Sequence, residues 1–252
     1  MIRQKQIWMI LGVIMVFHVA VVVCAEPIVT VGNFSQADPG AILPRFWEPL
    51  TFKKIKTHTS YEIVEDRGRT VVKAHSRASA SGLIRKISID VEKYPIVQWQ
   101  WKITGINKKT DVTQKSGDDY PARIYVAFVY NPDEAGFWEK TRFETVRLIY
   151  GEYPPATVVT YIWATRVPKE TRVPNPFVKR VMMIAVQSGE ENVGTWVTEE
   201  RNIYQDYLDS FGHPPPVTSG VAIMTDTDNT GEASTAFYGD IIFKSTSGPP
   251  VQ

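Results

Sequence analysis

The chain has 252 residues, of which 43% are hydrophobic, so it is long enough for one domain with a substantial core. Lysine and arginine number 28 against 27 aspartates and glutamates, which gives a formal net charge of +1 at pH 7. This balance excludes the basic footprint of a nucleic-acid-binding protein and also an acidic tail. We therefore expect no nucleic-acid partner.

The N-terminal segment has the order of a secretory signal peptide, which we assign to residues 1–25. Arg3 and Lys5 precede a long apolar run, and Ala25 is a small residue in the position before cleavage. We expect an exported protein of the periplasm or cell envelope. An uncleaved membrane anchor and lipidation at Cys24, the single cysteine, are the alternatives. In both alternatives only this segment contacts the membrane, whereas cleavage leaves no cysteine for a disulfide or a thiolate metal site.

From residue 26 onward, short apolar segments alternate with turn residues, which is typical of an antiparallel β-sandwich or jelly roll. The expected strands cover residues 27–34, 61–65, 70–75, 82–91, 96–104, 122–130, 157–164 and 181–187, with two more inside 219–243. Gly68 supplies the positive φ of a hairpin turn. The Pro-rich segment 167–177 must lie at a sheet end or on the surface, because proline removes a ladder donor. The prediction is one all-β domain over 26–244 and a flexible tail over 245–252.

The clearest period of two lies in residues 96–104 (IVQWQWKIT). One face of this strand carries Val97, Trp99, Trp101 and Ile103, and we expect it to face the core. The opposite face carries Gln98, Gln100 and Lys102. Amide and ammonium groups in such a row can hydrogen-bond the hydroxyls of a sugar. A solvated sheet face without a ligand is the alternative interpretation.

One amphipathic helix is predicted near residues 198–211. Thr198 is placed as the N-cap, with Glu199 and Glu200 in the first turn. Five apolar residues then follow at helical spacing: Ile203, Tyr204, Tyr207, Leu208 and Phe211. Gly212 ends the helix, and the prolines after it prevent its continuation. We expect this helix to cover one end or edge of the sandwich.

Oxygen-bearing side chains are concentrated in the loop that begins at Asp226 (DTDNTGE), and a second acidic turn precedes the strand at 122–130. Unpaired carboxylates are costly to bury, so these turns are either solvated or hold a cation. The candidate Ca²⁺ ligands are Asp118, Asp119, Asp226, Asp228, Asn229 and Glu232. The loop resembles the first half of an EF-hand, but Phe237 stands where the bidentate glutamate is needed. A turn held by side-chain-to-backbone hydrogen bonds is the alternative.

The same acidic residues raise the question of catalysis. Asp118 or Asp119 together with Asp226 or Asp228 would supply the carboxyl pair of a glycan-cleaving enzyme. A structural role, in which Arg123 neutralises one of the acids, is the alternative. The histidines lack metal-ligand spacing, and no nucleophile elbow, phosphate loop or dinucleotide fingerprint occurs in the sequence. These absences disfavour the common cofactor enzymes.

Five segments in fixed order carry a family resemblance. They are SGDDYPARIYVAF (116–128), YIWA (161–164), VPNPF (173–177), VQSGEENVGTWVTEERNIYQDY (186–207) and VAIMTDTDNTGEASTAFYGDI (221–241). Together they closely resemble the DUF3047 family of bacterial exported proteins, whose function is unknown. The resemblance implies a single bacterial domain outside the cytoplasm with no assigned activity. The strand FYGDI and the tryptophan strand are also similar to strands of carbohydrate-binding jelly rolls, a likeness of fold that does not fix function.

Three functions are compatible with these features. We favour a non-catalytic binding module of the bacterial cell envelope for a glycan or another polar ligand, with a structural calcium ion and no other cofactor. The candidate ligand-binding residues are Gln98, Gln100, Lys102, Arg123, Trp138 and Trp163. The alternatives are a glycan-acting enzyme that uses the four aspartates, and an envelope scaffold with a protein partner. The enzyme requires that the two acidic turns meet in one cleft.

Overall fold

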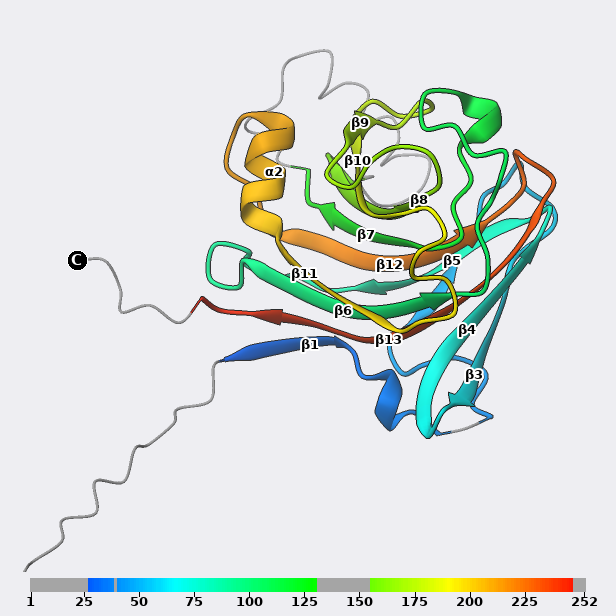
Figure 1. Ribbon diagram of the computed structural model, residues 1–252. Helices are drawn as coiled ribbons and strands as arrows, with labels where there is room; N and C mark the ends of the chain where they lie inside the picture. The colour runs from blue at the N-terminus through cyan, green and yellow to red at the C-terminus, as the bar shows by residue number, and fades with distance from the viewer. Residues whose placement is uncertain (1–26, 39, 131–154, 247–252) are drawn as a thin grey trace, which may run out of the picture.

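The computed structural model describes residues 27–38, 40–130 and 155–246, which form two stacked β-sheets with an α-helix at one end (Figure 1). The predicted all-β sandwich with one amphipathic helix is therefore confirmed. The assigned signal peptide and Trp138 lie outside the described residues. In the described ranges, none of the helices has the length and apolar character needed to cross a membrane.

Sheet A has six strands among the described residues, in the order β11–β6–β13–β4–β3, with β1 also paired to β13. Its strands are β1 (Ile28–Gly32), β3 (Ser60–Asp66), β4 (Arg69–Arg77), β6 (Ile96–Ile103), β11 (Val197–Asn202) and β13 (Ala233–Lys244). All of these pairs are antiparallel. The predicted hairpin joins β3 to β4, and Gly68 has a φ of 78° in its turn.

Sheet B has seven strands in the described part of the chain, in the order β2–β5–β12–β7–β8–β10–β9. Its strands are β2 (Glu48–Leu50), β5 (Ala80–Lys86), β7 (Arg123–Phe128), β8 (Val158–Ala164), β9 (Arg172–Pro174), β10 (Val181–Ser188) and β12 (Thr218–Asp226). The pair β8–β10 is parallel, which is an exception to the antiparallel pairing that we predicted. Between β8 and β10 the chain passes through the edge strand β9, which is antiparallel to β10. Because the chain reverses once more after β9, β10 runs in the same direction as β8. The Pro-rich segment therefore lies at a sheet edge, as its prolines require.

The helix α2 (Ile203–Phe211) starts later than predicted. Strand β11 continues to Asn202, and the side chain of Asn202, rather than that of Thr198, caps the helix by accepting a backbone N–H bond from its first turn. Glu199 lies in β11, because pairing with β6 prevails over the local capping pattern. Gly212 ends the helix in the left-handed conformation, as predicted. Two short 3-10 helices, η1 (Phe34–Gln36) and η2 (Lys115–Gly117), complete the described elements.

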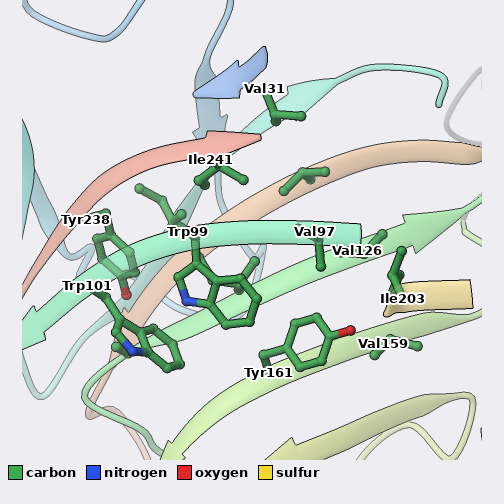
Figure 2. Close-up of a cluster of buried hydrophobic side chains, with 14 of the residues drawn as sticks. Val31, Val97, Trp99, Trp101, Val126, Val159, Tyr161, Ile203, Tyr238 and Ile241 are labelled. Carbon is green, nitrogen blue, oxygen red and sulfur yellow. The ribbon is translucent and has the colours of Figure 1, made fainter. Parts of the chain in front are cut away.

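The core between the sheets is rich in aromatic side chains. Trp99 and Trp101 of β6 are fully buried, as their shared strand face predicted. Figure 2 shows both rings on the side of β6 that faces Tyr161 of β8, and the ring centroids of Trp99 and Tyr161 are 4.9 Å apart. The centroids of Trp101 and Trp163 are 5.8 Å apart. Rings of this size supply much of the apolar burial that holds the sheets together.

Two connections cross between the sheets at the same end of the sandwich. One leads from β4 to β5 at residues 78–79, and the other, residues 227–232, leads from β12 to β13. The two crossings are hydrogen-bonded to each other. The backbone amide of Ala78 donates to the carbonyl oxygen of Glu232 at 3.0 Å. The backbone amide of Thr227 donates to the carbonyl oxygen of Ser79 at 2.9 Å. The acidic loop of the sequence is thus part of a junction between the two layers.

Candidate functional site

A groove of about 1300 Å³ lies over the outer face of sheet B. Its floor includes Arg123 and Tyr125 of β7 and Met224 and Asp226 of β12. These residues alternate with core residues such as Ile124, so strand geometry points them away from sheet A. The groove is therefore separate from the aromatic core and open to a ligand.

The two walls of the groove come from opposite edges of sheet B. One wall is residues 50–58, the end of β2 and the segment after it, and the other is residues 175–181, which lead from β9 into the start of β10. Phe52 and Phe177 are 37% and 51% exposed on these walls. Exposed aromatic rings in a groove provide surfaces on which a ligand can pack. The sequence analysis missed both residues, because each lies in a loop with no hydrophobic period.

The two acidic turns meet on this outer face. Asp118 and Asp119 precede β7, while Asp226 ends β12 and Asp228 lies in the turn after it. Carboxylate oxygens of Asp119, Asp226 and Asp228 all lie within 4.8 Å of one another. Antiparallel pairing of β12 with β7 is what brings these remote parts of the chain together.

Arg123 donates hydrogen bonds to both acidic turns. Its Nε donates to one carboxylate oxygen of Asp226 at 2.9 Å, and its Nη2 donates to the other oxygen. Its Nη1 donates to Asp118 Oδ1 at 3.2 Å, and Asn175 Nδ2 donates to the second oxygen of Asp118 at 2.7 Å. Arg123 lines the groove, but its donors point to carboxylates. This geometry favours the structural role over direct ligand binding.

Asp119 is fully buried and organises the turn at 227–232. It accepts hydrogen bonds from the amides of Asn229 and Thr230 at 3.3 and 2.6 Å, and from Asn229 Nδ2 at 3.0 Å. The two bonds from backbone amides are the side-chain-to-backbone bonds that the sequence analysis gave as the alternative to a cation. Asp228 is half-buried and lines the groove, so it is more accessible than Asp119.

The acidic turns hold more negative charge than Arg123 balances. Burial raises the pKa of Asp226 to about 8, with Asp119 adding to the rise and Arg123 opposing it. Burial and the neighbouring Asp119 also raise the pKa of Asp228. Close carboxylates in a poorly solvated place resist ionisation together, and a bound proton or cation relieves their repulsion.

Glu232 does not join this cluster, in contrast to our prediction. Its carboxylate oxygens accept hydrogen bonds from the backbone amides of Lys108 and Lys109, both at 3.2 Å. It therefore fixes the loop that follows β6. The reason is the turn at Gly231, whose positive φ of 69° redirects the chain after Thr230.

The polar row of β6 lies on the outer face of sheet A, on the other side of the sandwich from the groove. Lys102 is buried, in contrast to our prediction, because its Nζ hydrogen-bonds both oxygens of Asp66 at 2.6 and 2.7 Å. Although burial opposes the shift, the hydrogen bonds from Lys102 and Trp196 lower the pKa of Asp66. Gln100 pairs with Arg69 and Thr198, and Gln98 is half-buried beside it. The row is thus largely bonded to its own neighbours.

Trp163 is placed in the core, which corrects its assignment to a ligand-binding surface. It is fully buried, and its Nε1 donates to the carbonyl of Gly189 at 3.1 Å. A ligand therefore has no access to its ring. The alternation along β8 already put Trp163 on the same face as Tyr161, which is also in the core.

A family model described as "Protein of unknown function (DUF3047)" matches residues 45–242. The chain belongs to the DUF3047 family. The matched part of this DUF3047 protein contains both walls of the groove and both acidic turns. No protein with a curated description matches the chain.

Solved structures similar to this DUF3047 protein share 10% identity with it. The Emp47p carbohydrate recognition domain has a TM-score of 0.38, covering 86% of this chain and 94% of that one. The xylan-binding module CBM15 has a TM-score of 0.33, and the match covers 89% of this chain and 100% of that one. The Spr0440 glycoside hydrolase domain, Endo-D, from Streptococcus pneumoniae R6 has a TM-score of 0.35, and the match covers 81% of this chain and 22% of that one. At these TM-scores the likenesses carry no argument about the function of the DUF3047 protein.

Proposed function

We propose that this DUF3047 protein is an exported, non-catalytic binding module of the bacterial cell envelope, and that a glycan occupies the groove on sheet B. The observation that supports the proposal is the pairing of exposed Phe52 and Phe177 on opposite walls with a polar floor between them. The apolar face of a sugar ring packs on an aromatic ring, and its hydroxyls hydrogen-bond carboxylates and amides.

Binding accounts for the acidic turns better than hydrolysis does. A glycan-cleaving enzyme needs two carboxyl groups that both reach the substrate. Asp118, Asp119 and Asp226 are buried, and each is held by hydrogen bonds from Arg123, Asn175 or the turn at 227–232. Among the described aspartates of the cluster, Asp228 is the one with substantial exposure. A single accessible carboxyl group favours a ligand contact over acid/base catalysis.

Alanine at Phe52 or Phe177 is expected to weaken glycan binding about fivefold to tenfold, because a stacked ring contributes about 1 kcal/mol. A polysaccharide array identifies a bound polymer, and isothermal titration calorimetry with soluble fragments of it measures the change. Phe46→Ala is the matched control, since Phe46 is 65% exposed but does not line the groove. Wild-type affinity in both groove variants would show that the ligand does not lie there.

A calcium ion is the proposed cofactor of the same site. The close approach of Asp119, Asp226 and Asp228 supports it, because Ca²⁺ takes several carboxylate oxygens and compensates their charge. Asn229 and Asp118 lie beside these three residues, so they belong to the proposed surroundings of the ion. Arg123 already supplies one positive charge to Asp226, and the ion would add to its effect.

Calcium is expected to raise the melting temperature of the wild-type protein. A site filled at 100 times its dissociation constant stabilises the fold by about 2.7 kcal/mol. Asp228→Asn should reduce this response, whereas Asp209→Asn, which changes an acid on α2, should keep it. Differential scanning fluorimetry with calcium and with EDTA measures the shift. An unchanged melting temperature, together with no heat on calorimetric titration with calcium, would show that the site does not bind the ion. The proposal that a glycan binds in the groove would not be affected.

A further inference from the structure

The exposed charges on one wall of the groove are all positive. Residues 50–58 (LTFKKIKTH) include Lys53, Lys54 and Lys56, each exposed and each part of the groove lining. No acidic residue lies in this segment. The same segment carries Phe52, so this wall combines an exposed aromatic ring with three exposed lysines.

The opposite wall repeats this arrangement. The Nζ of Lys115 lies 5.3 Å from the ring centroid of Phe177, and Lys115 is exposed. Lys179 is exposed in the same wall segment, two residues after Phe177. Each exposed phenylalanine of the groove therefore has lysines beside it, although the two walls come from separate parts of the chain.

Three of the described acidic residues line the groove, namely Asp118, Asp226 and the half-buried Asp228. Asp118 and Asp226 are buried, and both accept hydrogen bonds from Arg123. Asp118 and Asp226 lie at the floor, and Asp228 is a single partly exposed acid, whereas three lysines are exposed on one wall, so the rim stays positive on balance. A charge at the rim meets an approaching ligand first and steers it, while a charge paired at the floor contributes little at a distance.

We propose that the ligand of the groove is an anionic polysaccharide, with sugar rings on Phe52 and Phe177 and acidic substituents facing Lys53, Lys54 and Lys56. This inference rests on the proposed function and specifies its ligand class. The anionic groups are carboxylates of uronic acids or ester-linked sulfate or phosphate, since an ammonium group pairs with each of them.

The test compares polygalacturonate with its fully methyl-esterified form, which has the same backbone without the charge. Calorimetry at low salt should show the charged polymer binding at least about tenfold more tightly, and added salt should reduce the difference. The triple variant Lys53→Gln, Lys54→Gln and Lys56→Gln should lose that advantage and keep its affinity for the ester. Dextran sulfate and phosphomannan, each against its neutral parent polymer, identify the preferred anion if it is not a carboxylate.

A matched triple variant controls for net charge. Lys73→Gln, Lys93→Gln and Lys169→Gln removes the same number of positive charges away from the groove lining and should bind every polymer as the wild type does. Equal loss in both triple variants would overturn the inference, because it would show an effect of overall charge.

The remaining outcomes separate the inference from the proposed function. Equal affinity for charged and neutral forms of every polymer overturns the anionic preference and leaves glycan binding in place. Failure to bind any polymer, charged or neutral, overturns both. Binding to phosphatidylglycerol vesicles through the same three lysines, without binding to any polysaccharide, would assign the groove to a membrane surface and also overturn both.

Discussion

Replacement of Arg123 by methionine is expected to lower the free energy of unfolding by about 3–5 kcal/mol, because it leaves buried carboxylates without their positive partner. Arg123 is 3% exposed and donates hydrogen bonds to Asp118 and Asp226. Methionine fills much of the same volume, so the loss reports the missing charge rather than a large cavity. Urea denaturation at pH 9, above the raised pKa of about 8 of Asp226, measures the change with this acid ionised in the wild-type protein.

A double-mutant cycle tests the assignment of this energy to the ion pair. Asp226→Asn combined with Arg123→Met should cost less than the sum of the two single variants, since each single change leaves the other partner unpaired. Arg69→Met is the control, because Arg69 is exposed and makes a surface hydrogen bond to Gln100, so we expect a change within about 0.5 kcal/mol. Strictly additive losses in the cycle would contradict the pairing.

Replacement of Asp206 by alanine is expected to cost about 3 kcal/mol or more. Asp206 lies in the first turn of α2 and is buried. It accepts hydrogen bonds from Arg201 Nε at 3.0 Å, from Arg172 Nη2 at 2.6 Å and from the hydroxyl of Tyr161 at 2.8 Å. These donors come from β11, β9 and β8, so one carboxylate fastens the helix to both sheets.

The neighbouring acid on the same helix provides the comparison. Asp209 keeps 44% of its side chain exposed, and its Oδ2 lies 3.4 Å from Arg172 Nη2. Asp209→Ala should therefore change the free energy of unfolding by no more than about 0.5 kcal/mol. Thermal and urea denaturation of the two variants side by side measure the difference, and equal losses would show that burial of Asp206 has no special value.

The strands were predictable because each follows a local rule. Alternation along β6 gave the burial of Trp99 and Trp101, and Gly68 marked the turn between β3 and β4. These local rules failed where the secondary structure or strand direction depends on pairing with strands that are distant in the sequence. The acidic start of α2 fits a helical first turn, but Glu199 pairs with β6 in β11, and the edge strand β9 makes β8 and β10 parallel.

The site was predictable only in its acidic part. The sequence shows a density of carboxylates in two turns, and it suggested that they are solvated, hold a cation or are partly neutralised by Arg123. It did not predict that Asp118, Asp119 and Asp226 would be buried. Lys102 looked exposed because its partner Asp66 lies 36 residues away in the chain. Phe52 and Phe177 looked like ordinary loop residues, and only their positions at opposite edges of sheet B place them across one groove.

If the proposed ligand binds at Asp228, the hydrogen-bonded crossings at 78–79 and 227–232 would give that site a mechanical role. Asp228 lies in the crossing that leads from sheet B to sheet A, and that crossing is bonded to the one between β4 and β5. An ion or sugar bound at Asp228, as proposed above, would therefore restrain both layers where they join. Occupancy would slow the opening of backbone amides in β4 and β13 as well as in β5 and β12, so the bound protein would resist proteolysis and pulling forces as a single unit.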